Sequence, residues 1–289
     1  STIGSMADLS AATLDTVREW FRDNYGPNNA VLVLAGDIDA AEARPLVERY
    51  FGPIPRGPVN VPAQADVPTL PARVDQVMHD RVANTRLYRN WVVPGLTHED
   101  QVPLQVAATV LGGLASSRLD NELVRQDQSA VRVAAYVQAF QRVSLFEVFV
   151  DVKPGQDADA VSRRLDAIIE EFIRTGPTED EVRRTVMRTM SGRIQGLEQV
   201  GGFGGKAVAL AEGMLYADDP SFYQSRLQQL GHGRPRLRPV VAEARDVLEE
   251  VVLHETAGAA GVQPVDHAVV GGVPRDDVVG GIARGRAGP

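Results

Sequence analysis

Apolar residues recur at helical spacing in two stretches near the start of the chain. Leu14, Val17 and Phe21 are three and four positions apart, and residues 40–51 carry a similar apolar face. Such spacing places the apolar side chains on one face of an α-helix. Between the two stretches, residues 31–35 form a short continuous apolar run that is typical of a buried strand. The pattern predicts a helix, a strand and a helix, the last third of an α+β domain whose beginning is absent.

Prolines crowd the segment that follows. They stand at Pro53, Pro55, Pro58, Pro62, Pro68 and Pro71. Proline fixes φ and has no N–H to donate, so we expect an extended linker here. We place a domain boundary near residue 65, so that residues 1–64 form a first unit with its linker.

Apolar and polar residues alternate in three later segments, which predict three strands over residues 87–93, 131–137 and 146–152. The last two strands are expected to pair antiparallel. Between the first and second strands, apolar residues 104–111 predict a helix that stops at a Gly-Gly pair, and a second helix is expected over residues 116–128.

Two long helices are expected after the strands. Apolar residues step by four, three and four over residues 161–172, before Gly176 and a proline end the helix. Thr178 and Glu181 have the spacing of a capping box at the start of the next helix. Because strands and helices do not alternate regularly, the order counts against a doubly wound sheet. It predicts an α+β fold in which an antiparallel sheet packs against helices, over residues 65–230.

The remaining segment, residues 231–289, differs in composition. It contains no Lys, Ser, Phe, Tyr or Trp, and many Gly, Val and Arg. Loss of aromatic residues deprives a segment of core-forming side chains. We expect this atypical tail to be poorly ordered, except for a helix around residues 241–253, and a frameshifted reading of a GC-rich gene is one hypothesis for its origin.

Charge and composition narrow the possible functions. The net charge of -8 and the pI near 5.2 argue against nucleic acid as a partner, because phosphate binding needs clustered Lys and Arg. No apolar run approaches the ~20 residues of a transmembrane segment. The chain begins without Met and without a signal-peptide pattern, so we expect a fragment truncated at its N-terminus. The absence of cysteine leaves a cytoplasmic and a periplasmic location equally open.

The histidines exclude one kind of metal site. No two of the five lie three or four residues apart, so a two-histidine zinc site on one helix is excluded by spacing. They are His79, His98, His232, His254 and His267. We therefore expect no metal bound by this chain.

A glycine cluster at residues 201–205, followed by Lys206, invites comparison with a phosphate-binding loop. The pattern fails because Val200 replaces a glycine and Ala207 replaces the Ser or Thr. A glycine hinge between two helices fits better, and a nucleotide-binding enzyme remains a third hypothesis that rests on this cluster alone. No G-x-S-x-G elbow or acid-base dyad is found, so no catalytic residue is predicted.

Several short sequence motifs, taken together in their order and spacing, carry a resemblance to a known family. They are residues 24–37, 50–55, 110–113, 116–119, 122–123, 146–147, 152–155 and 219–220. Together they cover roughly residues 1 to 230 and resemble the inverted-zincin peptidases, the family of insulin-degrading enzyme, pitrilysin and the mitochondrial processing peptidases.

The resemblance implies modules arranged as two halves that close around a peptide, with zinc held by H-x-x-E-H in the first module. That pentad is absent here. The chain would then be the end of a zinc-bearing module followed by a zinc-free one: a substrate-chamber module of a zinc metalloendopeptidase, inactive alone. The resemblance implies zinc in the missing catalytic module, on the same polypeptide or a separate subunit, and peptides as substrates. The alternative is a catalytically dead structural or assembly subunit of the same family.

In some members of that family an Arg and a Tyr seven residues apart contact the peptide from the non-zinc half. Here those positions align with Val124 and Val131, so the pair is not intact. Arg125 is one position away, and seven residues beyond it stands Arg132. A guanidinium donates paired hydrogen bonds to carboxylates and carbonyls, which makes Arg125 the candidate substrate-binding residue. The alternative is a surface arginine at a helix end.

Overall fold

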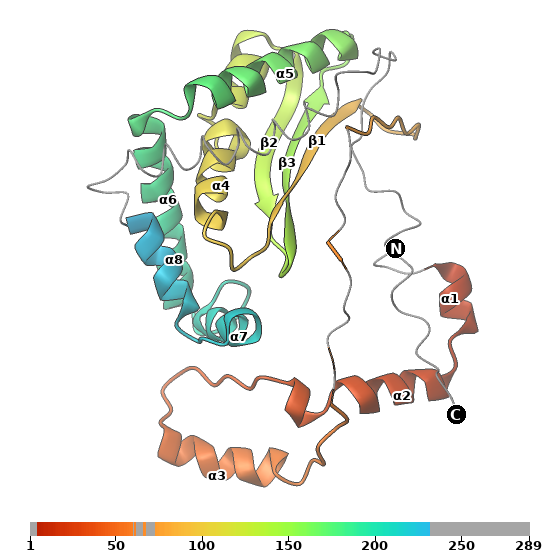
Figure 1. The fold of residues 1–289 in the computed structure, drawn as a ribbon, viewed down its shortest axis with the longest axis vertical. Helices are drawn as coiled ribbons and strands as arrows, with labels where there is room; N and C mark the ends of the chain where they lie inside the picture. Colours follow the sequence, from red (N-terminus) through yellow and green to blue (C-terminus); the bar gives the residue numbers. More distant parts are fainter. Residues whose placement is uncertain (1–4, 60, 62–65, 68–72, 232–289) are drawn as a thin grey trace. The chain divides into compact units, whose positions relative to one another are not determined.

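The fold is described from a computed structural model, which describes residues 5–59, 61, 66–67 and 73–231 (Figure 1). The tail expected to be poorly ordered, including the helix around residues 241–253, lies outside the described residues except for Gly231. The described chain divides into two compact units. One comprises residues up to Asp66 together with Gln195–Phe222, and the other comprises Val67–Ile194 together with the residues from Tyr223.

The first unit is built from helices. They are α1 (Met6–Ala11), α2 (Leu14–Asn24), the 3₁₀ turn η1 (Pro27–Asn29), α3 (Ala40–Phe51) and α7 (Lys206–Ala217). The two helices predicted from periodicity are α2 and α3. Each begins after a side chain that accepts a hydrogen bond from the first turn: Thr13 from the Thr16 N–H, and Asp39 from the Glu42 N–H. Such caps satisfy backbone donors that have no partner inside the helix.

The strand predicted over residues 31–35 is wrong in this structure, because no strand among the described residues pairs with this segment. Its side chains are accordingly exposed, with Val31 37%, Leu32 50% and Leu34 50% accessible. A strand exists only through the neighbour that accepts its backbone hydrogen bonds. The apolar run therefore identifies a segment suited to a strand but not its partner.

A three-stranded antiparallel sheet forms the centre of the second unit. Its strands are β1 (Arg86–Pro94), β2 (Ala130–Gln138) and β3 (Val143–Val152), in the order β1-β3-β2. The three strands predicted from alternation and the antiparallel pairing of β2 with β3 are confirmed. The α+β class is confirmed with them.

Six helical segments accompany the sheet. They are α4 (Gln101–Ala108), η2 (Thr109–Gly113), η3 (Asp120–Gln126), α5 (Ala158–Thr175), α6 (Glu179–Glu198) and α8 (Phe222–Gly231). Figure 1 shows α4 beside the strands and α5 across one end of them. The two helices predicted before β2 are present, but η2 and η3 are π-helical. Within the described residues, none of the helices has the length and hydropathy required to cross a bilayer.

The core lies between the helices and one face of the sheet. Phe146 and Val148 of β3 are buried there with Leu165 and Phe172 of α5. Arg89 also points into this layer: its side chain is only 8% exposed, and its guanidinium donates two hydrogen bonds to Asp166 at 2.8 and 3.0 Å. A buried charge is tolerated when it is paired in this way, and the pair joins β1 to α5.

The predicted capping box at the start of α6 is confirmed. The Glu181 N–H donates to Thr178 Oγ1 at 3.3 Å, and the Thr178 N–H donates to Glu181 Oε2 at 2.7 Å. The preceding helix ends at Gly176, whose φ of 67° lies in the left-handed region. Glycine adopts that region without the strain a Cβ would cause.

Candidate functional site

Arg125, the substrate-binding candidate from the sequence, lies near the end of η3 and is 58% exposed. Its Nε donates to Asp120 Oδ2 at 2.7 Å, and its Nη2 donates to the Ala115 carbonyl. The neighbouring Val124 instead packs against the core. The structure therefore places Arg125 on the surface, with its guanidinium turned towards its own helix and the loop before it.

The metal-ligand chemistry of the described residues is sparse. His98 Nδ1 lies 3.1 Å from Asp100 Oδ2, which gives two donors, and no group of three or more His, Cys, Asp or Glu residues is found in the described part of the chain. A structural or catalytic zinc ion needs three or four protein ligands. The described residues therefore do not fit a zinc ion. Three of the five histidines, at positions 232, 254 and 267, lie outside the described residues.

The glycine cluster forms the loop that joins α6 to α7. The Lys206 N–H donates to the Gln199 carbonyl at 2.9 Å, and the Ala207 N–H donates to the Val200 carbonyl at 3.1 Å. A phosphate-binding loop instead directs its backbone N–H groups at the anion. The geometry supports a connecting loop, and it counts against the phosphate-binding interpretation.

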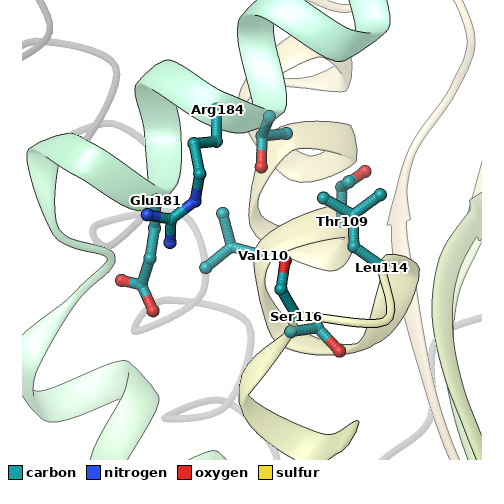
Figure 2. Close-up of a pocket in the computed structure, with 8 residues that line it drawn as sticks. Thr109, Val110, Leu114, Ser116, Glu181 and Arg184 are labelled. Carbon is teal, nitrogen blue, oxygen red and sulfur yellow. The ribbon is translucent and has the colours of Figure 1, made fainter. Parts of the chain in front are cut away.

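A shallow hollow lies between η2 and the start of α6 (Figure 2). It is lined by Thr109, Val110, Leu114, Ser116, Ser117, Glu181, Arg184 and Thr185. Figure 2 shows Glu181 and Arg184 on the α6 side and Thr109, Val110 and Ser116 on the opposite side. Ser117 is 3% exposed, and its Oγ has no hydrogen-bond partner among the described residues.

The negative charge of Glu181 in this hollow is already neutralised. Glu181 accepts hydrogen bonds from Nε and Nη2 of Arg118, both at 2.9 Å, as well as from Thr178. Burial acts to raise the pKa of Glu181, but the bonds from Arg118 and Thr178 outweigh it, so the pKa lies below its ordinary value. A carboxylate held in this way is a poor general base. The hollow therefore offers hydroxyl groups but no acid-base pair.

The face of the sheet that points away from the core carries an ordered polar and aromatic surface. Arg86, Asp151 and Arg132 stand side by side across the three strands. Arg86 Nε and Nη2 donate to the two carboxylate oxygens of Asp151 at 2.6 and 2.9 Å. The guanidinium carbons of Arg86 and Arg132 lie 4.5 and 5.2 Å from the centroid of the Phe149 ring, which is the geometry of cation–π contacts.

A second polar pair lies further along the same face. The Tyr136 hydroxyl donates to Glu147 Oε1, its cross-strand neighbour. This hydrogen bond and partial burial raise the pKa of Tyr136 to about 12. Hydrogen bonds in register across strands hold these side chains in defined positions.

Sequence reasoning did not single out this outer face. The signal was present, because the alternation that predicts the strands also assigns their intervening positions to one common face. The cross-strand neighbours of Arg132 depend on the register, which no local pattern of the sequence supplies.

The chain is similar to known proteins in both sequence and fold. The family described as "Peptidase M16 inactive domain" matches residues 11–189. The zinc protease PqqE of Helicobacter pylori is 26% identical over 204 residues, which cover 68% of this chain and 45% of that protein.

Two solved structures share the fold. A protease from Helicobacter pylori superposes with a TM-score of 0.74 at 23% identity, over 86% of this chain and 58% of that one. The peptidase M16 inactive domain from Pseudomonas fluorescens gives a TM-score of 0.72 at 15% identity, over 87% of this chain and 57% of that one. The chain spans about half the length of the curated relatives it matches.

Proposed function

Because the chain belongs to the peptidase M16 family and matches its inactive domain, we propose that it is the substrate-chamber module of a zinc metalloendopeptidase and does not hydrolyse peptides alone. The proposal is carried by this match, taken together with the finding that the described residues contain no set of metal-binding side chains that fits zinc. In this proposal the module encloses and positions a peptide, and the hydrolytic chemistry belongs to a zinc-bearing module on the same polypeptide or a separate subunit.

The proposed organisation assigns residues 1–64 to the C-terminal part of the zinc-bearing module with its linker, and residues 65–230 to the zinc-free module. The described chain divides at Asp66, close to the proposed boundary near residue 65, although Gln195–Phe222 groups with the residues before it. The exposed apolar run at residues 31–35 and the exposed side chains of Trp20 and Phe21 support the first assignment, because apolar surfaces of this kind are normally covered. Arg125 is proposed to contact the peptide through its exposed side chain.

The test compares the purified chain alone with the chain co-expressed with a zinc-bearing M16 module from the same genome. Metal content is measured by mass spectrometry, and hydrolysis is followed with internally quenched peptides. We expect less than stoichiometric zinc and no hydrolysis for the chain alone, and hydrolysis for the pair. The matched control is a partner in which the glutamate of H-x-x-E-H is replaced by Gln.

Peptidase activity of the chain alone that survives purification and disappears with a chelator would refute the proposal. A stable complex with the zinc-bearing module that never hydrolyses peptides would instead favour the structural or assembly subunit.

A further inference from the structure

Two arginines of the second unit, Arg193 of α6 and Arg226 of α8, lie close together beside α4. Figure 1 shows α6 and α8 next to each other, and a Cβ added at Gly231 of α8 would lie 3.8 Å from Met190 Cε of α6. Burial lowers the pKa of Arg226, and the charge of Arg193 lowers it further. Two positive groups from different helices therefore share one region of the second unit.

Arg226 is fixed by the turn that precedes α4. Its residue is only 8% exposed, and its Nη1 donates to the His98 carbonyl at 3.2 Å and to Gln229 Oε1 at 3.1 Å. Its Nη2 donates to the Leu96 carbonyl. Each of these three acceptors is a neutral carbonyl group. The three bonds thus hold the guanidinium in place without contributing a negative charge.

Arg193 has a neutral partner and no ion pair with any described residue. Its Nη2 donates to the amide oxygen of Gln105, on α4, at 2.8 Å. Burial lowers the pKa of Arg193, and no described carboxylate acts in the opposite direction. Asp100, at the start of α4, instead places Oδ2 at 3.1 Å from His98 Nδ1. A shielded cation without a counter-charge is unfavourable, and folded proteins normally pair such a group.

The donors that remain on Arg193 suit an oxyanion. Its Nε and Nη1 make no hydrogen bond with any described residue, and they lie in the same plane as the bonded Nη2. Parallel N–H groups of a guanidinium match two oxygens of a carboxylate or a phosphate group. The start of α4 adds positive potential, because Asp100 makes no side-chain capping bond there.

We propose that Arg193 and Arg226 form a binding site for a small oxyanion, a carboxylate or a phosphate group, beside α4. Arg193 donates to the oxyanion, and Arg226 contributes a second positive charge from a fixed position. The bound group supplies the counter-charge that Arg193 lacks among the described residues, so it stabilises the second unit by mass action. The inference goes beyond the proposed function, since it involves neither a peptide nor hydrolysis.

The test titrates the purified chain with inorganic phosphate and, separately, with malonate, against potassium chloride at equal ionic strength. Isothermal titration calorimetry measures binding, and thermal unfolding measures Tm. We expect saturable binding and a rise in Tm with at least one of the two anions. Arg193→Gln should weaken that binding about tenfold, because it removes a charge-assisted hydrogen bond. Arg188→Gln changes an exposed arginine of the same helix and should leave binding unchanged.

A second variant, Gln105→Glu, places a carboxylate where Arg193 already donates. We expect it to raise Tm in chloride alone and to abolish the response to phosphate and malonate. Arg193→Lys keeps the charge but loses the planar donors, so its binding should lie between wild type and Arg193→Gln. Phosphate also raises Tm by exclusion from the protein surface, but exclusion affects every variant, Arg188→Gln included. Circular dichroism verifies that each variant is folded.

The proposal is overturned if neither anion binds saturably to the wild-type chain, or if Arg193→Gln and Arg188→Gln have equal effects. A full anion response in Gln105→Glu would also overturn it. Binding of phosphate alone would support a phosphate-bearing ligand, and binding of malonate alone would support a carboxylate. None of these results depends on zinc or on peptide hydrolysis, so failure here and failure of the proposed function are distinguishable.

Discussion

Glu181 is the residue whose removal should most clearly separate local from tertiary stabilisation. It closes the capping box of α6 with Thr178 and receives two hydrogen bonds from Arg118, whose side chain comes from the segment before η3. The side chains of Arg118 and Glu181 are 18% and 19% exposed, so the pair is largely shielded from solvent. We predict that Glu181→Ala destabilises the second unit more than any exposed glutamate does.

The magnitude follows from the contacts that are lost. Loss of a helix cap costs about 1 kcal/mol. Loss of a hydrogen-bonded charge that is mostly buried costs about 1.5–3 kcal/mol, and Arg118 retains the Gly176 carbonyl as a partner. We therefore expect Glu181→Ala to lower the free energy of unfolding by about 2–4 kcal/mol. Thr178→Ala removes the hydroxyl that caps the helix and donates to Glu181 but leaves the Arg118–Glu181 pair, so we expect a loss of about 1 kcal/mol.

The pH dependence has a defined sign. Burial acts to raise the pKa of Glu181, but the hydrogen bonds from Arg118 and Thr178 lower it by more. In the folded chain the pKa of Glu181 therefore lies below the ordinary value of 4.5. A carboxyl group with a depressed folded pKa contributes stability that is fully present above its unfolded pKa. That contribution is lost as the pH falls through the folded pKa. The stability difference between wild type and Glu181→Gln should thus be constant near pH 7 and shrink below about pH 4.5.

The assay is urea unfolding followed by circular dichroism between pH 3 and pH 7. The matched control is Glu170→Gln, on the exposed side of α5, which should change stability by less than about 0.5 kcal/mol. If Glu181→Gln and Glu170→Gln were equally stable at pH 7, or if their difference did not change down to pH 3, the reasoning would be refuted.

The buried Arg89 with its half-exposed partner Asp166, and two glycines, give further predictions. Asp166→Ala leaves the buried guanidinium of Arg89 without its carboxylate and should lower the free energy of unfolding in urea by about 3–5 kcal/mol, and a loss below 1 kcal/mol would contradict this. Gly176→Ala forces a Cβ into a φ of 67° and should destabilise by about 1 kcal/mol. Gly192→Ala, inside α6 with no atom within 4 Å of the added Cβ, should stabilise by about 0.5–1 kcal/mol, and thermal unfolding that showed the same sign for both glycines would count against the conformational argument.

Features that depend on residues close together in the sequence were predictable. The alternation of apolar and polar residues in β1, β2 and β3, the helical spacing of apolar residues in α5 and the capping box at Thr178 each involve neighbours within a few positions. The absence of a zinc motif and the family resemblance are also properties of the sequence alone. In each case the physical cause is local: side-chain direction repeats every two residues in a strand and every 3.6 in a helix.

Features that depend on distant partners were not predictable from these patterns. Residues 31–35 have the composition of a strand, but no described strand pairs with them. The alignment places Val124 at the family's arginine position and Arg125 one residue away, whereas the pairing of Arg125 with Asp120 follows from the π-helical turn of η3. The position of Arg132 beside Asp151 and Phe149 depends on the register of three strands.

The sequence by itself therefore determined the three strands of the sheet and most of the helices, which face of each is apolar, and which family the chain resembles. Only the tertiary structure decided which charges meet across the sheet and in which order the three strands pair. The physical reason is that a shift of one residue between two strands reverses the face of every side chain, while the apolar pattern of each strand alone stays the same.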